Sequence, residues 1–334
     1  MMTLSRESDP LLSRSSNGTP VILQEGPQSI FETLNHLTWD CWILIASKIV
    51  RMFSYGILAV ILMIYLQTLH FTDAEIGLLF TLILVGDAVL SIVLTTHADR
   101  WGRRFTLILG SVIAIMTGFI FSTSTNFTVL LVTGVLGVIS PSGSELGPFM
   151  AIELSALSEI SLPAQRTALM AWYNLFGSLA AAFGALVCGY ILHYLQYNVH
   201  YSIRKCAQLA LILYTLIQLV QLSLFYKLSA LVEAKHSPQA TSTSLPGFLG
   251  IHKSRHIVLL LCLLFAMDSF GGSFVLQSIV STWFFNTYHT DTLLLGSIVF
   301  WCNIAAGRRG RGVWVCNGYG NGFGHVYVYG SCTY

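Results

Sequence analysis

Long apolar runs separated by short polar connections occupy the chain from residue 42 to residue 307. An α-helix needs about 20 predominantly apolar residues to cross the hydrocarbon core of a bilayer. The pattern therefore predicts an all-α membrane protein with eight spanning helices. These lie at residues 42–67, 76–97, 104–123, 128–152, 167–192, 207–226, 256–283 and 292–307.

The composition agrees with a protein dissolved in lipid. Charged residues make up 10% of the 334 residues and apolar residues 54%, whereas charged residues are about 25% of ordinary soluble proteins. So few charges could not cover the surface of a soluble fold of this size. The net charge of +2 indicates no nucleic-acid partner. The seven cysteines lack metal-binding spacing, and we predict no metal and no cofactor.

The charges of the connections orient the predicted helices. If the N-terminus is cytoplasmic, ten Lys and Arg residues of the connections lie inside and two, Arg204 and Lys205, lie outside. The positive-inside rule favours this orientation. Residues 1–41 are polar, and we expect them to be cytoplasmic and disordered. Residues 227–255 contain Ser-Pro and Leu-Pro-Gly and are predicted to be a cytoplasmic linker.

A weak internal repeat divides the apolar part of the chain. His70-Phe-Thr-Asp73 resembles His289-Thr-Asp291, and Arg51-Met-Phe53 has a partner in Asp268-Ser-Phe270, at offsets of 217 to 219 residues. A nearly constant offset predicts two parallel repeats of six helices. Residues 42–226 would form a complete first half, and residues 256–307 two helices of an incomplete second half.

The connection between the second and third predicted helices reads Asp99-Arg100-Trp101-Gly102-Arg103-Arg104. Glycine permits a tight turn between packed helices, and an acid with three arginines can form a charge network. The hexapeptide resembles the D-R/K-x-G-R-R/K signature of the major facilitator superfamily. The bland alternative is a positive cytoplasmic loop that happens to contain glycine.

This resemblance implies a major-facilitator-type helical bundle that moves a solute by alternating access. The implied gating loop is made of Asp99, Arg100, Gly102, Arg103 and Arg104. Two features depart from the family. Thr95 stands where the family usually has glycine, and the late helix of the second half that this loop engages is not predicted in this chain.

Ionisable side chains within the first two predicted spans form the centre of the candidate site, because a charge in lipid is costly and usually functional. Arg51 lies near the middle of the first span, and Lys48 lies one turn closer to the cytoplasm on the same face. Asp87 lies at nearly the depth of Arg51 and is its expected ion-pair partner. A purely structural ion pair, and a Lys48 that snorkels to the interface, are the alternatives.

The later spans add further candidates. Glu145 lies in Ser140–Pro148, where two prolines and two glycines predict a break in the fourth helix. Asp268 is the counterpart in the second half, and Tyr173 and Asn174 could add hydrogen bonds. Asp87, Glu145 and Asp268 are candidates for proton exchange, since burial disfavours a charged carboxylate. Glu153, near the helix end, is left outside this site.

The composition changes sharply at residue 308. Residues 308–334 contain seven glycines and no Leu, Ile, Ala or Met. We expect an aberrant tail, produced by a frameshift or mis-splice that replaces the last four helices of the fold. A natural Gly/Tyr-rich appendage is the alternative. Near the other end, Glu7-Ser-Asp-Pro-Leu11-Leu12 resembles an acidic dileucine sorting signal, which favours a vacuolar or lysosomal membrane over the plasma membrane.

Two functions remain open from the sequence. The first is secondary active transport of a small polar solute, coupled to protons by symport, in the lipid bilayer. The second is a non-transporting membrane protein, either receptor-like or an inactive fragment of a transporter. We predict no enzyme, because the chain has no His-Glu-x-x-His, no Gly-x-Ser-x-Gly and no pair of aspartates on one helix.

Overall fold

The computed structural model of the chain describes residues 12–14, 20–22, 37–137, 139, 148–162, 165–229, 232–233, 255–273, 277–288 and 291–309. The chain divides into two units, Met1–Leu37 and Thr38–Tyr334. In the first unit, strands β1 (Leu12–Arg14) and β2 (Pro20–Ile22) pair antiparallel, with Leu12 opposite Ile22. The structure thus differs from the expected disorder of residues 1–41 at these six residues and at Trp39–Cys41, the start of the first helix.

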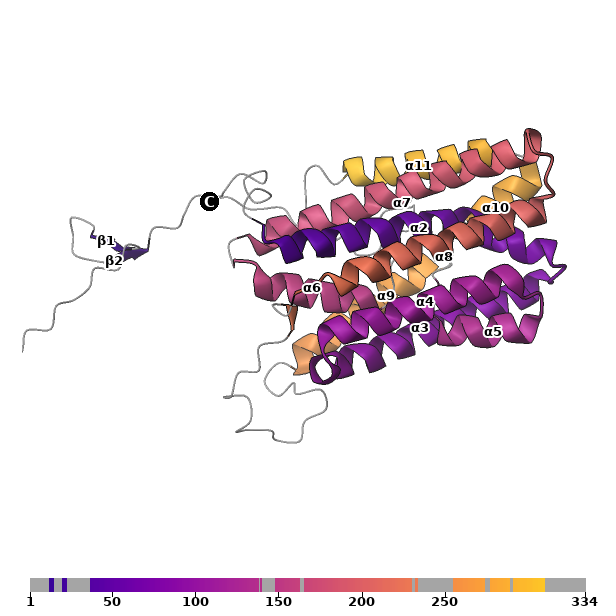
Figure 1. Cartoon of the computed structure of the whole chain (residues 1–334). Coiled ribbons are helices and arrows are strands. Elements are labelled where there is room, and N and C mark those ends of the chain that lie inside the picture. Colours follow the sequence, from indigo (N-terminus) through magenta and orange to yellow (C-terminus); the bar gives the residue numbers. More distant parts are fainter. Residues whose placement is uncertain are drawn as a thin grey trace, which may run out of the picture. The chain divides into compact units, whose positions relative to one another are not determined.

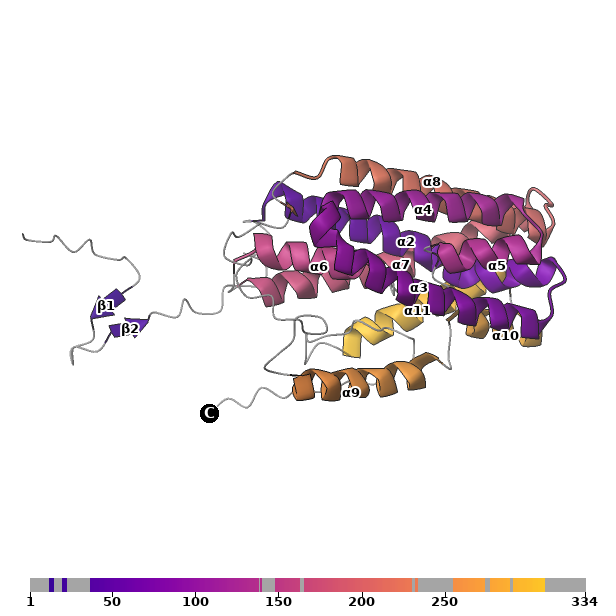
Figure 2. The same ribbon diagram turned by 90° about the horizontal axis from the view of Figure 1, so that it is seen from below.

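The second unit is helical over nearly all of its described residues (Figures 1 and 2). Its helices are α2 (Trp39–Thr68), α3 (Asp73–Trp101), α4 (Arg103–Thr123), α5 (Phe127–Leu136), α6 (Pro148–Ile160), α7 (Arg166–Tyr197), α8 (Ile203–Tyr226), α9 (Arg255–Ser273), α10 (Gln277–Tyr288) and α11 (Thr292–Arg309). Among them α2, α3, α4, α7 and α8 are long and apolar enough to cross a membrane. The predicted all-α membrane fold is confirmed.

Two of the predicted helices are divided in the structure. The segment 128–152 becomes α5 and α6, and the expected break falls between Leu136 and Pro148. The segment 256–283 becomes α9 and α10, which the hydrophobic pattern did not predict. Helix α9 ends at Ser273, directly after Gly271 and Gly272, because glycine lacks the side chain that restricts the backbone to helix.

Local capping explains how α3 begins and how the chain turns into α4. The Thr72 hydroxyl accepts a hydrogen bond from the Glu75 amide, and the Glu75 carboxylate accepts one from the Thr72 amide at 2.8 Å. Helix α3 ends at Gly102, whose φ of +97° is open to glycine and strained for other residues. Helix α4 begins at the next residue, so the gating loop is very short.

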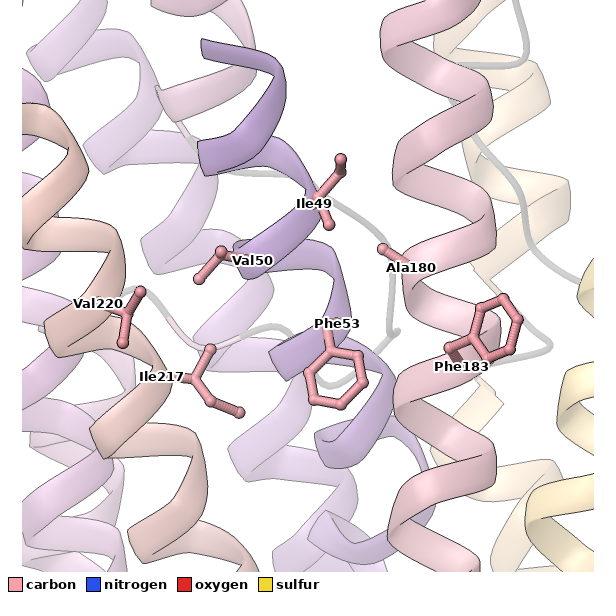
Figure 3. A pocket seen from close by; sticks show the side chains of 7 residues that line it. All are labelled: Ile49, Val50, Phe53, Ala180, Phe183, Ile217 and Val220. Atoms are coloured by element: carbon pink, nitrogen blue, oxygen red, sulfur yellow. The ribbon is translucent and has the colours of Figure 1, made fainter. Parts of the chain in front are cut away.

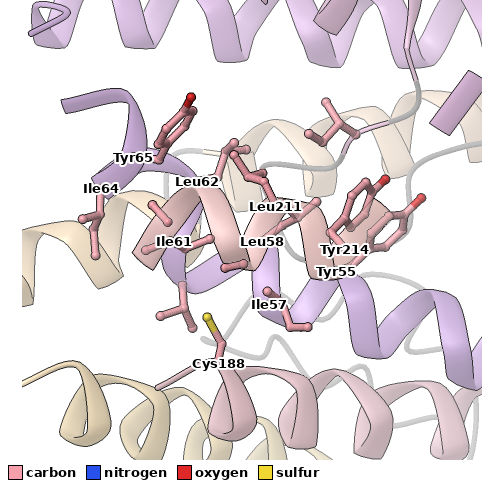
Figure 4. Packing of buried hydrophobic residues seen from close by; sticks show 14 of the residues in the cluster. Tyr55, Ile57, Leu58, Ile61, Leu62, Ile64, Tyr65, Cys188, Leu211 and Tyr214 are labelled. Atoms are coloured by element: carbon pink, nitrogen blue, oxygen red, sulfur yellow. The ribbon is translucent and has the colours of Figure 1, made fainter. Parts of the chain in front are cut away.

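Helix α2 lies at the centre of the bundle and packs against α7, α8 and α10. Its buried apolar residues, among them Ile57, Leu58 and Ile61, form the core with residues of α7 and α8 (Figure 4). The backbones of α2 and α7 touch, because a Cβ atom at Gly56 would overlap the carbonyl oxygen of Ala181. This close contact fixes α7, which carries one of the site residues, against α2.

Candidate functional site

A buried ion pair between α2 and α6 forms the centre of the candidate site. Arg51 Nη1 lies 2.8 Å from Glu153 Oε1, and Arg51 Nη2 lies 2.6 Å from Glu153 Oε2. Both side chains are 0% exposed. This is the two-pronged geometry in which a guanidinium binds a carboxylate most strongly. The pair joins two helices whose residues are 102 positions apart in the sequence.

Two hydroxyl groups complete the coordination of the Glu153 carboxylate. Ser47, on α2, donates to Glu153 Oε1 at 2.8 Å, and Tyr173, on α7, donates to Glu153 Oε2. The Tyr173 hydroxyl also lies 3.4 Å from Arg51 Nη2. The carboxylate therefore accepts four hydrogen bonds from three side chains, which offset the cost of removing its charge from water.

A second cation and two aromatic rings surround the pair. The Lys48 ammonium lies 4.7 Å from the centre of the Tyr173 ring, and the Arg51 guanidinium lies 4.8 Å from the centre of the Phe149 ring. Both distances fit cation–π contacts. Gly177 makes room for Lys48, since a Cβ atom there would lie 2.7 Å from Lys48 Cε. Lys48 is buried, so it does not snorkel to the interface.

The structure corrects the predicted partner of Arg51. Its guanidinium binds Glu153 instead of Asp87, because α6 brings Glu153 to the same depth as Arg51. Asp87 is also buried, at 2% exposure, but its Oδ1 has no hydrogen-bond partner among the described residues. Glu153, which the sequence analysis left outside the candidate site, lies in the same buried cluster as Arg51. The signal available in the sequence was the single acid of the mostly apolar run 148–157.

Within the described ranges, the structure does not bring the other predicted site residues into contact with the Arg51–Glu153 pair. Asn174, on α7, is half-buried, and no contact links its side chain to Arg51 or Glu153 in the described part of the chain. Glu145 lies outside the described residues. Asp268 is part of α9 and Asp99 is part of α3, but their side chains also lie outside the described part.

The gating loop is held by two carboxylates that the sequence did not indicate. Arg103 Nη1 lies 2.6 Å from Glu159 Oε2, at the end of α6. The amides of Arg103 and Arg104 donate to the Glu233 carboxylate at 2.8 and 3.3 Å. That carboxylate thereby caps the first turn of α4 from beyond the end of α8.

The remaining members of the loop point elsewhere. Arg104 Nη2 donates to the carbonyl oxygen of Tyr226 at 2.6 Å, which joins the loop to the last turn of α8. The side chain of Arg100 is exposed. Arg103 and Arg104 therefore join α4 to α6 and α8 through Glu159, Glu233 and the Tyr226 carbonyl. The acid of the predicted network, Asp99, has its side chain outside the described residues.

An apolar groove lies on another face of α2, between α2, α7 and α8 (Figure 3). Its lining contains only hydrocarbon side chains, which suits an acyl chain better than a polar solute. The lining residues are Ile49, Val50, Phe53, Ala180, Phe183, Ile217 and Val220. Among the described residues, no three His, Cys, Asp or Glu side chains gather as metal ligands.

Comparison with known proteins identifies relatives of this fold. The family model described as Major Facilitator Superfamily matches residues 44–316. The uncharacterized membrane protein YJR124C of Saccharomyces cerevisiae is 29% identical over 296 residues, which are 81% of this chain and 66% of that protein. The quinolone resistance protein NorA of Staphylococcus aureus is 28% identical over 85 residues, 25% of this chain and 22% of NorA.

A solved structure of a bacterial homologue of the human drug peptide transporters PepT1 and PepT2 shares 17% identity and gives a TM-score of 0.47. The superposition covers 82% of this chain and 55% of that chain. This likeness is too low to bear on the solute. The chain thus spans less than two thirds of these proteins.

The family match covers most of the chain and includes the gating loop and the ion-pair helices α2, α6 and α7. It agrees with the five helices that, in the described part of the chain, are long and apolar enough to cross a membrane. The chain is an integral membrane protein with several spans. It belongs to the Major Facilitator Superfamily.

Proposed function

We propose that this chain takes part in secondary active transport of a small polar solute by alternating access. Membership of the family supports transport in general. The observation that carries the proposal is the fully buried group of Arg51, Glu153, Tyr173 and Ser47. Buried charges in a membrane bundle are costly, and those that are present usually serve binding or coupling.

The hydrogen bonds around Glu153 suggest how a proton could be coupled to the solute. While Glu153 is ionised, Arg51 and Tyr173 are occupied by its carboxylate. A proton on Glu153 would remove the charge that holds the guanidinium and would free donors for a polar solute. Asp87, buried with an oxygen that has no partner among the described residues, is a second candidate for carrying the proton.

The membrane and its orientation are part of the same proposal. The basic residues of the gating loop favour a cytoplasmic position for this loop and for the N-terminus. The dileucine-like segment at residues 7–12 favours a vacuolar or lysosomal membrane, with the plasma membrane as the alternative.

A binding screen followed by uptake tests this function. The purified chain would be heated with a panel of amino acids, small organic acids and sugars, and solutes that raise the melting temperature would be used for uptake into proteoliposomes. We expect uptake driven by an inward proton gradient. The variant Arg51→Ala should lose uptake, and Glu153→Gln should lose the response to the gradient.

The matched control is Glu159→Gln, which removes a carboxylate of the same helix that faces Arg103 instead of Arg51. Its effect on solute binding should be small. A folded, inserted chain that binds and moves no member of the panel would favour the alternative, a membrane protein without transport activity. Normal, gradient-driven uptake by Glu153→Gln would remove this carboxylate from the coupling mechanism.

A further inference from the structure

Several helices end or begin at the end of the bundle opposite the predicted gating loop (Figure 1). Among them are the last turns of α2, α7 and α10 and the first turn of α11. With a cytoplasmic N-terminus, this end faces outward. Helices α10 and α11 follow the linker, so contacts of α10 with α2 and of α11 with α7 join the two parts of the repeat.

An ion pair joins α7 to α11 at this outer end. His193 Nδ1 lies 2.7 Å from Asp291 Oδ2, and the side chains are 33% and 35% exposed. Although the two atoms are this close, His193 Nδ1 makes no aligned hydrogen bond with the described residues. The attraction therefore depends on the positive charge of the imidazolium, which is present only when the ring is protonated.

Below this pair the two helices are in backbone contact. A Cβ atom at Gly189 would lie 2.6 Å from the carbonyl oxygen of Thr292 and 3.0 Å from the Cα of Gly296. Gly189 precedes His193 by four residues and therefore lies on the same face of α7. The ion pair consequently lies at the outer edge of a tightly closed helix contact.

The other outer contact is neutral. Gln67 Oε1 accepts a hydrogen bond from Asn286 Nδ2 at 3.1 Å, which joins α2 to α10. These residues are 219 positions apart, an offset of the internal repeat, so they are equivalent positions of the two parts. Gln67 also donates to Asp73 at 3.4 Å, the repeat equivalent of Asp291. Amides keep their hydrogen bonds between pH 5 and 8, so protonation does not act on the α2–α10 contact in this range.

We propose that His193 and Asp291 form a protonation-dependent latch that closes the outer end of the bundle. The sign follows from the charges. A protonated His193 attracts the Asp291 carboxylate and favours the closed end, so the latch is strongest at acid pH. An imidazole is charged at acid pH and neutral at alkaline pH, and the attraction ends when the ring is neutral. That the latch regulates transport rests on the proposed function. The pH-dependent closing of the outer end does not.

Among the described residues, Asp291 is the acid that pairs with His193. The other groups at this end are aromatic, basic or more distant in the chain. On its own helix, Tyr197 lies with its ring centre 4.5 Å from that of His193. Helix α8 begins with Arg204 and Lys205, and Lys205 lies 5.8 Å from the ring centre of Tyr201. The same end of the bundle also carries Tyr194 on α7, Tyr288 on α10, Gln67 in the last turn of α2, His70 after α2, Asp73 on α3 and His200 after α7.

Thiol labelling tests the latch without any solute. Leu295, one turn beyond Asp291 in α11, is 1% exposed and would become the reporter as Leu295→Cys. The seven native cysteines would be replaced by alanine. A membrane-impermeant maleimide would measure the opening of the outer end in proteoliposomes at pH 5.5 and pH 8.5. Dividing the rate of the Asp291→Asn variant by that of the parent cancels the pH dependence of the thiol itself.

We expect this ratio to be between about twofold and fivefold at pH 5.5, as suits a partly exposed pair, and close to one at pH 8.5. His193→Gln should label like Asp291→Asn at both pH values. His193→Lys, which keeps its charge throughout, should label slowly at both. The control His200→Asn, at an exposed position of the same end, should keep the profile of the parent.

A ratio that is equal at the two pH values would overturn the latch, and so would a His193→Gln variant that keeps the profile of the parent. The retained slow labelling of His193→Lys guards against a variant that has merely lost its fold. A latch without uptake would refute the proposed transport alone. Proton-driven uptake without pH-dependent labelling would refute the latch alone.

Discussion

Substitution of Glu153 tests whether its ion pair with Arg51 serves transport or only joins α2 to α6. In Glu153→Gln, the amide cannot neutralise Arg51, which is 0% exposed and surrounded by α2, α6 and α7. Four hydrogen bonds to the carboxylate are weakened or lost. Leaving one buried charge without its partner typically costs about 3–5 kcal/mol of folding free energy.

The expected consequence is a large loss of thermal stability in detergent. At roughly 2–4 °C for each kcal/mol in a domain of 150–250 residues, the melting temperature should fall by about 10 °C. The control Glu159→Gln breaks a pair with Arg103 in which the acid is 34% exposed. Such exposed pairs contribute about 0–1 kcal/mol, so its melting temperature should change little.

The double variant Arg51→Met with Glu153→Leu distinguishes the two roles. Replacing both buried charges with apolar side chains of similar size is often neutral for stability. We expect the double variant to recover most of the stability lost in Glu153→Gln and to remain unable to bind or move solute. Full transport by the double variant would refute the functional role. A loss below about 1 kcal/mol in Glu153→Gln would refute the reasoning about burial.

Three further predictions concern single contacts and can be measured by thermal unfolding and by the yield of monodisperse protein. Tyr173→Phe removes one hydrogen bond to a charged group and should cost about 1.5–3 kcal/mol. Gly102→Ala places a side chain at φ +97° and near Glu233 Oε1 (3.1 Å), and should cost about 1–2 kcal/mol; an unchanged melting temperature would contradict this strain. Gly184→Ala would overlap the carbonyl oxygen of Phe53 and should reduce the yield of folded protein, whereas Gly77→Ala, with open space around it, should not.

The hydrophobic pattern predicted most of the fold because each spanning helix must be apolar along its whole length. The predicted bounds of the first helix, 42–67, lie within α2. The division of 256–283 into α9 and α10 was missed, since two adjacent glycines do not interrupt an apolar run. The strands at residues 12–14 and 20–22 were missed because a polar composition favours disorder.

The candidate site could be predicted only in part. Burial of Arg51, Lys48, Asp87 and Tyr173 followed from their positions inside apolar segments. The pairing of Arg51 with Glu153 depends on how α6, which begins at Pro148, approaches α2, and no local pattern encodes this approach. The contact of Glu233 with the amides of Arg103 and Arg104 likewise joins residues about 130 positions apart in the sequence.

Helix α7 is continuous from Arg166 to Tyr197 and carries both Tyr173 and His193. Twenty residues separate these side chains, which corresponds to about 30 Å along one helix. If binding at Tyr173 and protonation at His193 both favour particular positions of α7, each must change the affinity of the other by the same factor. Addition of solute to the weakly buffered protein would then take up or release protons at the outer end, and calorimetry in buffers of different ionisation enthalpy would count them without any movement of solute across the membrane.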